Sequence, residues 1–466
     1  MRNPIQKILI VLLALSMLAC KTTPQKTEEN SCSPKTKAVV KSEVNVPDWS
    51  KDATIYEVNV RQYTPEGTFV AFEKQLPRLQ SLGVKILWIM PINPISEKNR
   101  KGTLGSYYAV QDYKKVNPEF GTLDDFKELV TKSHELGFKV IIDWVANHTG
   151  WDNVWMAKHP DWYTTDSTGK IISPVPDWSD VADLNYDNKE MRAAMIDAME
   201  YWLKEADIDG FRCDVAGMVP VDFWDEARAD LDKIKPVYML AEDEADKDFL
   251  LKAFNMNYGW EFHHIMNEIA QGKLTADAVK AYVEKTDSVY PEGTYPMQFT
   301  SNHDENSWNG TEYERLGDAV KTMAALTFIV PGMPLIYTGQ EAGNTKRLKF
   351  FDKDQVDWSN LEMQDFYKKL IDMKEANKAL WNGDAGATLH FLHTGEDNSL
   401  LAMCRQKDDN KVLAIFNLSP DSVTNTVECP RIAGDYRNTL TGEKITCKKG
   451  QSFTLKGWGY LILTGE

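Results

Sequence analysis

Residues 121–148 read GTLDDFKELVTKSHELGFKVIIDWVANH, and this stretch decides the fold class. Its first half predicts a helix, because Thr122 is a suitable N-cap, Asp125 stands three residues later, and apolar residues recur with the helical period until Gly137. Its second half, residues 138–146, is an almost continuous apolar run of strand length. Strands that are apolar on both faces are typical of parallel sheets covered by helices.

The same alternation of short apolar runs with longer amphipathic segments extends from about residue 50 to about residue 380. The apolar runs are 53–60, 84–91, 138–148, 208–216, 236–243, 295–304 and 334–341, with a weaker run near 258–262. Eight strand–helix units predict an α/β fold, a (β/α)8 TIM barrel. The alternative is a doubly wound open sheet, but no glycine-rich phosphate loop follows the first run.

Two further segments define the predicted domains. Residues 148–185 are rich in Trp, Pro, Gly and Asp with little periodicity, which predicts a short inserted domain after the third strand. From about residue 385 the helical pattern stops and short alternating runs follow, which predicts an antiparallel β-sandwich. Those runs are 387–393, 399–406, 411–419, 452–456 and 460–465. We therefore expect the barrel at 48–384 and the C-terminal β domain at 385–466.

The N-terminal segment predicts export. Arg2 and Lys7 accompany an apolar run at 8–19 that is too short to span a membrane comfortably, so residues 1–19 are interpreted as a signal peptide. Cys20 follows directly, which resembles a bacterial lipoprotein signal with a lipidated Cys; plain secretion is the alternative. Residues 20–47 are polar and aperiodic and are interpreted as a tether. The expected location is membrane-anchored, facing the periplasm or the cell surface.

Composition narrows the function classes. The formal net charge of -16 and the pI near 5.1 argue against nucleic acid and anionic membrane surfaces as partners. Most of the 14 Trp, 18 Tyr and 18 Phe must pack in the core, but some can serve as flat platforms for sugar rings. No cysteine pair has zinc-site spacing, and no cofactor is expected for catalysis. Two alternatives remain open for Cys429 and Cys447: they form a disulfide with each other, or both are free thiols.

Polar side chains gather where the predicted strands end, which is where parallel barrels place their chemistry. They are Asp143, Asn147 and His148 after the third run, Arg212 and Asp214 on the fourth, Glu242 after the fifth, and Asn302, His303 and Asp304 after the seventh. Any one of them has an ordinary explanation, such as a helix cap. Together they bring three carboxylates to one barrel mouth, where mutual repulsion would destabilise the fold unless the carboxylates had a use.

Two carboxylates facing one pocket are the signature of glycoside hydrolysis. Arg212 and Asp214 stand two residues apart on a strand, so they face the same side, and we expect the guanidinium to keep Asp214 ionised as the nucleophile. Glu242 follows the apolar residues YMLA and lies near other carboxylates. Both effects raise the pKa of Glu242, as a general acid requires. Asp304 is then the third carboxylate, which binds sugar hydroxyls.

Taken together, these motifs resemble glycoside hydrolase family 13, the α-amylase family, over most of the chain from about residue 50 to 466. The matching motifs are DWVANH (143–148), ADLN (182–185), GFRCDVA (210–216), MLAE (239–242) and FTSNHD (299–304). The resemblance implies a retaining mechanism in which Asp214 forms a covalent glycosyl intermediate, Glu242 is the acid/base and Asp304 stabilises the transition state. In such a mechanism the carboxyl groups of Asp214 and Glu242 lie ~5–5.5 Å apart.

The resemblance also implies which residues contact the sugar, and it leaves open whether the protein binds a structural metal ion. The implied sugar contacts are Tyr108, His148, Arg212, His303 and Arg347. Many members of the family have Lys and His where this chain has Gly217 and Met218, so the preference for sugar beyond the cleaved bond stays open. A structural Ca²⁺ also stays open, since Asn147 and Asp183 match its ligands.

The expected function is therefore a retaining α-glucan hydrolase that cleaves α-1,4-glucosidic bonds of starch or malto-oligosaccharides. A transglycosylase or isomerase on the same site is the alternative from the same chemistry. A non-catalytic glycan-binding protein is the alternative from another class, and the presence of all three carboxylates argues against it.

Overall fold

The protein, represented here by a computed structural model, is described for residues 40–395 and 398–465. The predicted signal peptide, Cys20 and the tether up to residue 39 lie outside the described residues. Ser42 and Glu43, which we assigned to the tether, contact the barrel: Ser42 Oγ donates to the Leu250 carbonyl at 2.7 Å, and the Glu43 N–H donates to the Leu251 carbonyl at 2.8 Å. Within the described part of the chain, every helix is too short or too polar to cross a bilayer.

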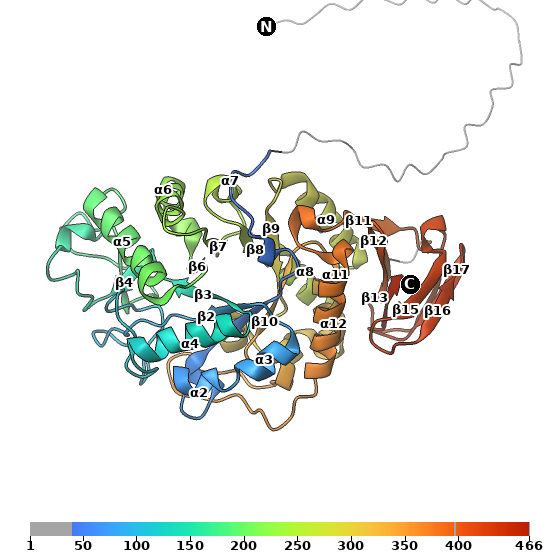
Figure 1. The fold of residues 1–466 in the computed structure, drawn as a ribbon, viewed down its shortest axis with the longest axis horizontal. Coiled ribbons are helices and arrows are strands. Elements are labelled where there is room, and N and C mark those ends of the chain that lie inside the picture. Colours follow the sequence, from blue (N-terminus) through green and yellow to red (C-terminus); the bar gives the residue numbers. More distant parts are fainter. Residues whose placement is uncertain (1–39, 396–397, 466) are drawn as a thin grey trace, which may run out of the picture. The chain divides into compact units, whose positions relative to one another are not determined.

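Eight parallel strands close into a barrel in the order β1-β10-β9-β8-β7-β6-β3-β2. In Figure 1 the labelled barrel strands lie at the centre, with helices around them. The barrel strands are β1 (Ile55–Val58), β2 (Ile86–Ile89), β3 (Lys139–Trp144), β6 (Gly210–Cys213), β7 (Tyr238–Ala241), β8 (Met256–Tyr258), β9 (Tyr295–Gln298) and β10 (Met333–Tyr337). The predicted (β/α)8 barrel is confirmed, and the open-sheet alternative is excluded because β1 pairs with both β2 and β10.

The weakest predicted strand was misplaced. We put it near residues 258–262, whereas β8 ends at Tyr258 and helix α8 begins at Trp260. The aromatic residues at 258, 260 and 262 alternate as in a strand, but Phe262 continues into the helical series Phe262, Met266 and Ile269, which is buried. The helical period of that longer segment decides its structure.

Helices cover the outside of the barrel, and along the chain they alternate with its strands (Figure 1). Those of the described residues are α1 (Val60–Tyr63), α2 (Phe69–Glu73), α3 (Leu76–Leu82), α4 (Leu123–Glu135), α5 (Lys189–Ala206), α6 (Val221–Leu231), α7 (Phe249–Lys252), α8 (Trp260–Ala270), α9 (Ala276–Val289), α10 (Glu312–Leu316), α11 (Val320–Ile329) and α12 (Gln364–Ala376). Helix α4 has the predicted capping box, in which Thr122 Oγ1 accepts the Asp125 N–H and Asp125 accepts the Thr122 N–H. The helix ends at Glu135, and Gly137, two residues later, has a left-handed φ of 88°.

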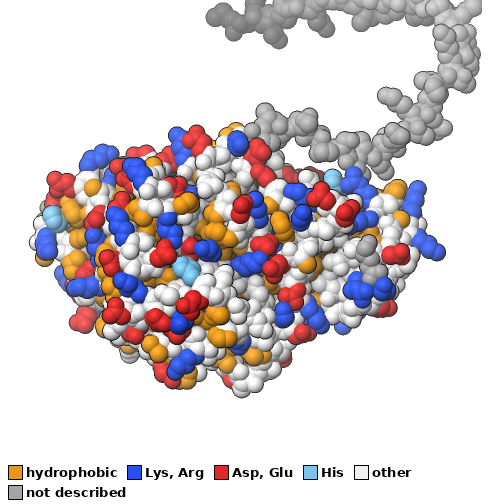
Figure 2. All heavy atoms as spheres, viewed as in Figure 1, with side chains coloured by type: hydrophobic (Ala, Val, Ile, Leu, Met, Phe, Trp, Pro, Cys, Tyr) orange, Lys and Arg blue, Asp and Glu red, His pale blue; other side chains and the backbone are white. Residues whose placement is uncertain are grey.

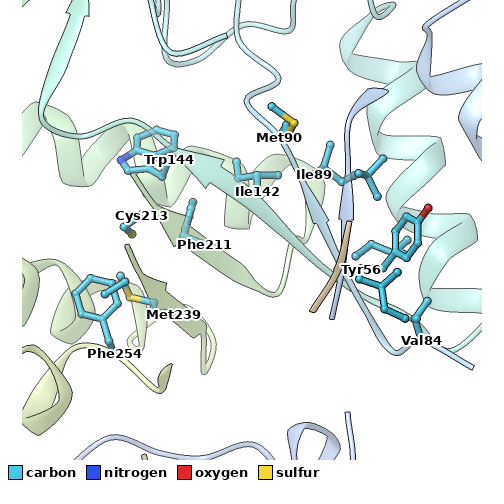
Figure 3. Packing of buried hydrophobic residues seen from close by; sticks show 14 of the residues in the cluster. Tyr56, Val84, Ile89, Met90, Ile142, Trp144, Phe211, Cys213, Met239 and Phe254 are labelled. Atoms are coloured by element: carbon cyan, nitrogen blue, oxygen red, sulfur yellow. The ribbon is translucent and has the colours of Figure 1, made fainter. Parts of the chain in front are cut away.

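Successive residues of the barrel strands alternate between two apolar clusters. On β3, Ile141 packs inside the barrel, while Val140 and Ile142 pack against the surrounding helices. Figure 3 shows the outer cluster, where Ile142 of β3 lies between Ile89 of β2 and Phe211 of β6. Burial on both faces explains why the strands are continuous apolar runs. It also makes any charged residue at an inward position conspicuous.

The segment inserted after the third barrel strand begins and ends in a small antiparallel pair, β4 (His148–Gly150) with β5 (Val181–Asp183). Trp155 and Trp162 pack against each other within it, with ring centroids 5.3 Å apart. The β4–β5 pair places His148 opposite Asp183, so both ends of the inserted segment stay beside β3.

The C-terminal part is all-β, as predicted. A six-stranded antiparallel sheet has the order β11-β12-β13-β18-β15-β16, and β14 pairs with β17. The strands are β11 (Leu389–Leu392), β12 (Leu400–Lys407), β13 (Asn410–Asn417), β14 (Val423–Val427), β15 (Gly434–Asn438), β16 (Lys444–Cys447), β17 (Gln451–Leu455) and β18 (Tyr460–Gly465). The polar strands β14, β15 and β16 were not among the predicted runs. Within the described part of the chain, Cys429 and Cys447 are buried and form no disulfide, which favours the free-thiol alternative.

Candidate active site

The carboxyl ends of the first barrel strands bring four polar or aromatic side chains to inward positions. Strand pairing aligns Glu57 of β1 with Trp88 of β2, and Asp143 of β3 with Arg212 of β6. Glu57 has the same parity as Ile55, and Asp143 the same parity as Ile141, both of which pack inside the barrel. Side chains two residues apart on a strand share a face, so these charged groups also point inward.

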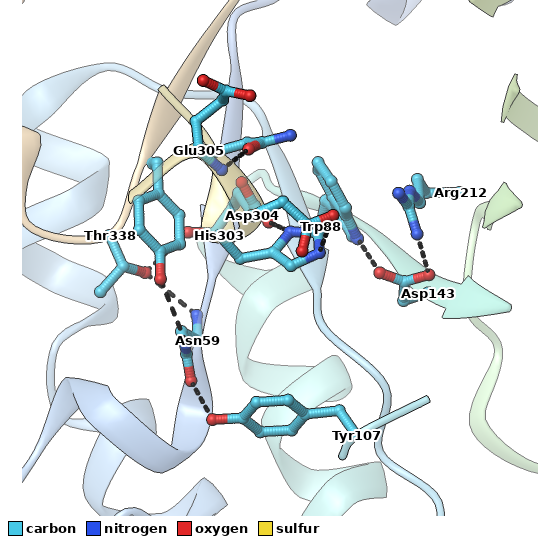
Figure 4. Close-up of polar contacts among 12 residues, drawn as sticks. Asn59, Trp88, Tyr107, Asp143, Arg212, His303, Asp304, Glu305 and Thr338 are labelled. Carbon is cyan, nitrogen blue, oxygen red and sulfur yellow. Dashed lines mark hydrogen bonds and ion pairs between the residues drawn. The ribbon is translucent and has the colours of Figure 1, made fainter. Parts of the chain in front are cut away.

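Arg212 is the centre of the site. Its Nη1 donates to Asp143 Oδ1 at 2.8 Å and to Asp214 Oδ1 at 2.9 Å, and its Nη2 forms an ion pair with Glu242 Oε2 at 2.8 Å. Its Nε donates to the Tyr258 hydroxyl at 3.1 Å. The side chain is fully buried, and Figure 4 shows it facing Asp143. The predicted pairing of Arg212 with Asp214 is thus present, and three carboxylates share this one guanidinium.

Burial dominates the electrostatics of the two carboxylates nearest Arg212. Burial raises the pKa of Asp214 well above its ordinary value; Arg212 lowers it in opposition, and the charge of Glu242 raises it further. Arg212 therefore acts on the pKa of Asp214 in the direction that we expected, but desolvation outweighs it. Burial also raises the pKa of Glu242 against the opposing effect of Arg212, in the direction that we expected.

His303 lies between two other carboxylates. Its Nδ1 lies 2.5 Å from Glu57 Oε1, and its Nε2 lies 3.4 Å from Asp304 Oδ2. Burial opposes protonation of the ring, but Asp304 and Glu57 outweigh it and raise the pKa of His303 to about 9. Asp304 is the most open of the three predicted catalytic carboxylates: its side chain is 39% exposed, against 10% for Asp214 and 13% for Glu242.

Tyr108 connects the two halves of the site. Its hydroxyl donates to Asp143 Oδ2 at 3.0 Å and lies 2.7 Å from His303 Nε2, and its ring is stacked on that of His303. His148 lies beside Trp178, with ring centroids 5.5 Å apart. Burial lowers the pKa of His148 to about 4, so this ring is neutral at pH 7 and can both donate and accept a hydrogen bond.

One predicted sugar contact lies apart from this cluster. Arg347 is half exposed and forms a bidentate pair with Glu314, with Nε–Oε2 and Nη2–Oε1 distances of 2.9 and 3.1 Å. No interaction between Arg347 and any of the three carboxylates is present among the described residues.

Three members of the site escaped the sequence reasoning. They are Glu57, which bonds His303, and Trp88 and Tyr258, which contact Asp143 and Arg212 respectively. Glu57 has a signal that would have revealed it, because it is the one charged residue of the apolar run 53–60. Trp88 and Tyr258 have none, since aromatic residues are ordinary in buried strands.

The two predicted calcium ligands are neighbours in the structure but do not make a calcium site by themselves. Asp183 pairs with His148, next to Asn147, so one carboxylate and one amide meet there. The carbonyls of Ala146, Asn147 and His148 already accept hydrogen bonds from Tyr186, Leu184 and Tyr113. Ca²⁺ takes about six to eight oxygen ligands, and in the described part of the chain no group of three or more His, Cys, Asp or Glu side chains could hold a metal. The calcium stays a prediction.

The space beside Gly217 is taken by an acidic side chain. A Cβ at this position would lie 2.4 Å from Asp243 Oδ2, so the carboxylate of Asp243 occupies the space that a side chain at 217 would need. Next to it, the side chain of Met218 is 44% exposed. The surface just beyond Asp214 therefore carries an acidic group and a thioether in place of the Lys and His that many members of the family have there.

A closed parallel barrel with buried carboxylates on a shared guanidinium at its mouth is the architecture of a barrel glycosidase. Comparison with protein families agrees. The description "Alpha amylase, catalytic domain" matches residues 50–179 and 175–417, and "Alpha amylase, C-terminal all-beta domain" matches residues 392–464. The chain belongs to the α-amylase family, glycoside hydrolase family 13.

Individual relatives support this assignment. The chain is similar to a noncanonic maltogenic alpha-amylase, AmyB, from Thermotoga neapolitana (30% identity, TM-score 0.82, 90% of this chain and 99% of that chain). It is also similar to an alpha-amylase from Lactobacillus plantarum (32% identity, TM-score 0.80, 90% and 100%). The alpha-amylase MalA of Haloarcula japonica is 27% identical over 84% of this chain, which spans 60% of the length of MalA.

Proposed function

We propose that this protein is a retaining α-glucan hydrolase that cleaves α-1,4-glucosidic bonds of starch or malto-oligosaccharides. The observation that carries the proposal is the shared contact of Arg212 with Asp214 and Glu242, in a chain of the α-amylase family. Two carboxylates on one guanidinium are close enough to serve one scissile bond from two sides. Relatives named maltogenic alpha-amylase and cyclomaltodextrinase, which match 90% and 85% of the chain, are consistent with such a substrate.

The proposed steps follow from the environments of the two groups. Asp214 attacks the anomeric carbon and forms an ester, while the glycosidic C–O bond breaks and Glu242 gives its proton to the departing oxygen. Water then attacks the anomeric carbon and loses a proton to Glu242, and Asp214 is released as a carboxylate. Oε2 of Glu242 already faces the Val215 N–H at 2.7 Å and Arg212 Nη2 at 2.8 Å, so the transferable proton belongs on Oε1.

The raised pKa values of both carboxylates suit this division of labour. Two buried carboxylates next to one cation hold one proton between them more readily than none. Arg212 Nη1 donates to Asp214 Oδ1, and Glu242 Oε2 accepts the Val215 N–H, so one oxygen of each carboxyl group has no hydrogen bond among the described residues. In the proposed mechanism the shared proton lies on Glu242, and Asp214 is charged when substrate binds. Asp304, the most exposed of the three carboxylates, is free to accept hydrogen bonds from sugar hydroxyls.

A product profile tests the proposal. The chain starting at residue 40 is incubated with maltoheptaose, with Asp214→Ala as the blank, and the products are separated by size. We expect only products shorter than the substrate, which are absent from the blank. Products longer than maltoheptaose would move the assignment to a transglycosylase. A profile identical to that of the blank, on maltoheptaose and on starch, would overturn the proposed activity.

We further propose that the protein is exported and anchored by a lipid on Cys20, facing the periplasm or the cell surface. The support is the order of basic Arg2 and Lys7, an apolar run at 8–19 and Cys20 directly after it. Full-length protein expressed in a bacterial host should sediment with membranes, and Cys20→Ser should appear in the soluble fraction. Equal sedimentation of both forms would contradict lipid anchoring at Cys20.

A further inference from the structure

Trp308 is an unusual surface residue. Among residues 40–395 and 398–465, it is the one aromatic residue in the set of exposed large hydrophobic side chains, with 50% of its surface open to solvent. It stands four residues after Asp304, at the mouth of the barrel. Full burial of an indole ring would stabilise the fold, and a half-exposed ring does not contribute that stabilisation. Its exposure beside a candidate active site therefore suggests a function.

The indole has a direct contact to the site. Its Nε1 donates a hydrogen bond to Asp304 Oδ1 at 3.2 Å, while Oδ2 of the same carboxylate faces His303 Nε2 at 3.4 Å. The carboxylate of Asp304 is thus held from both of its oxygens. Because its side chain is 39% exposed, these two contacts are what fixes its orientation toward an incoming sugar.

The segment that carries Trp308 is firmly tied down. It is a single π-helical turn, Glu305–Asn309, in which Asn309 Nδ2 donates to Glu305 Oε1 at 2.8 Å. Ser307 Oγ donates to the Leu348 carbonyl at 2.9 Å, and Asn306 Oδ1 accepts the Leu348 N–H at 2.8 Å. Single π-helical turns are rare and occur frequently at functional sites. Here the turn directs an indole back to the preceding carboxylate.

One side of the Trp308 ring packs against other aromatic rings, which extend to the active site. Its centroid lies 5.1 Å from that of Phe350 and 5.6 Å from that of Phe351. Phe350 is in turn stacked on Tyr108, which is stacked on His303. The four rings Trp308, Phe350, Tyr108 and His303 therefore form a continuous aromatic wall from solvent to the carboxylates, and the unpacked surface of Trp308 is its outer end.

We propose that Trp308 has two roles at this site: its indole N–H positions Asp304, and its exposed ring binds a glucose unit adjacent to the cleaved bond by stacking. The proposal rests on the proposed function. The C–H groups on one face of a pyranose are attracted to the electron-rich face of an indole, in the way that aromatic edges are. A rigid, pre-oriented ring also costs little entropy on binding.

The two roles separate in a pair of variants. Trp308→Phe keeps a flat ring but lacks the N–H, so kcat on maltoheptaose should fall about tenfold, as expected for a hydrogen bond to a charged group, while KM stays within about twofold. Trp308→Leu keeps apolar volume against Phe350 but has no flat ring, so KM should also rise about three- to tenfold. Trp381→Phe is the matched control: its indole N–H donates to the Glu375 carbonyl, away from the site, and both constants should be unchanged.

Wild-type turnover of maltoheptaose is measured first, so that failure of the proposed function is seen independently of Trp308. Given that turnover, an unchanged kcat in Trp308→Phe would overturn the positioning role, and an unchanged KM in Trp308→Leu would overturn the stacking role. Binding of maltoheptaose to Asp214→Ala with and without Trp308→Leu, measured by calorimetry, provides a second readout. It should show the same three- to tenfold weakening, and equal affinities would overturn sugar binding by the ring.

Discussion

Oε1 of Glu57 lies 2.5 Å from Nδ1 of His303, deep in the barrel mouth and 246 residues away in sequence. Glu57 is fully buried, and its other oxygen, Oε2, has no hydrogen-bond partner among residues 40–395 and 398–465. This contact and the charge of Asp304 overcome the burial of the imidazole and raise the pKa of His303 to about 9. His303 is therefore a cation at neutral pH, with Nε2 turned toward Tyr108 and Asp304. Glu57 is a positioning residue that acts through His303.

Glu57→Gln should lower the pKa of His303. A raised pKa means that the charged ring is fully formed below its ordinary pKa of about 6.5 and is lost as the pH rises through about 9. Removing the charge of Glu57 takes away part of that shift, so the pKa of His303 should fall by about one unit or more. The measurement is an NMR titration of the His303 ring from pH 5 to 10, because the alkaline limb of kcat/KM reports the proton donor Glu242; the exposed Glu443→Gln is the control. Superimposable titration curves of His303 in wild type and Glu57→Gln would contradict this role.

Arg212→Met should destabilise the protein strongly. The substitution leaves Asp143, Asp214 and Glu242 buried without their shared cation. Breaking a buried pair typically costs about 3–5 kcal/mol, which urea unfolding at pH 7 would measure. Arg347→Met is the matched control, because its pair with Glu314 is half exposed and is worth about 0–1 kcal/mol. The loss in Arg212→Met should shrink as the pH falls, because burial raises the pKa values of Asp214 and Glu242 and these groups then accept protons. Equal losses in the two variants would mean that the buried carboxylates do not need the guanidinium.

Much of this architecture is visible in the sequence, because it depends on local period and on parity. The capping residues Thr122 and Asp125 fix where α4 starts, and the two-residue spacing of Arg212 and Asp214 fixes their common face. Since every strand of a parallel barrel ends at the same mouth, polar residues after the apolar runs meet there. The same reasoning failed at residues 258–262, where an aromatic alternation was the start of a helix.

What the sequence does not contain is the balance of long-range effects. Glu57 meets His303 only because β1 closes the barrel against β10, and that register is a property of the whole sheet. The raised pKa of Asp214 depends on how completely the finished fold removes water, which outweighs the nearby Arg212. Arg347 is drawn to Glu314 by a pairing across 33 residues that no motif announces. Trp308 likewise reaches Asp304 through a π-helical turn that periodicity does not predict.

Val215 offers a test of backbone strain beside the nucleophile. It has φ 37° and ψ 45°, a left-handed conformation that is unfavourable for a β-branched residue, and its N–H holds Glu242 Oε2. An Ala in this conformation costs about 1–2 kcal/mol, and glycine avoids that cost. Val215→Gly should therefore be more stable than Val215→Ala by about 0.5–1 kcal/mol after the greater flexibility of unfolded glycine is counted.

Val70, which is exposed on helix α2, is the control position, where the Ala variant should be more stable than the Gly variant. There the Ala variant should exceed the Gly variant by about 1 kcal/mol in the free energy of unfolding. The four variants are compared by urea unfolding under one set of conditions. The same order at both positions would show that the left-handed geometry of Val215 carries no cost, and the reason for its placement beside Asp214 would have to be sought elsewhere.

Glu242→Gln separates the acid role of this residue from a purely structural one. The amide keeps the size of the side chain but has no proton to give, so hydrolysis of maltoheptaose should fall by about 10²–10⁴-fold. A maltosyl fluoride has a leaving group that needs little protonation, so formation of the glycosyl-enzyme from it should survive within about tenfold.

Adding azide, a nucleophile that needs no general base, should then restore turnover of the fluoride and give a maltosyl azide of retained configuration. Asp214→Ala should show no activity on either substrate and no rescue of this kind, because the ester cannot form. Equal loss on both substrates in Glu242→Gln would contradict proton donation by Glu242 and would leave its contacts with Arg212 and Val215 as its role.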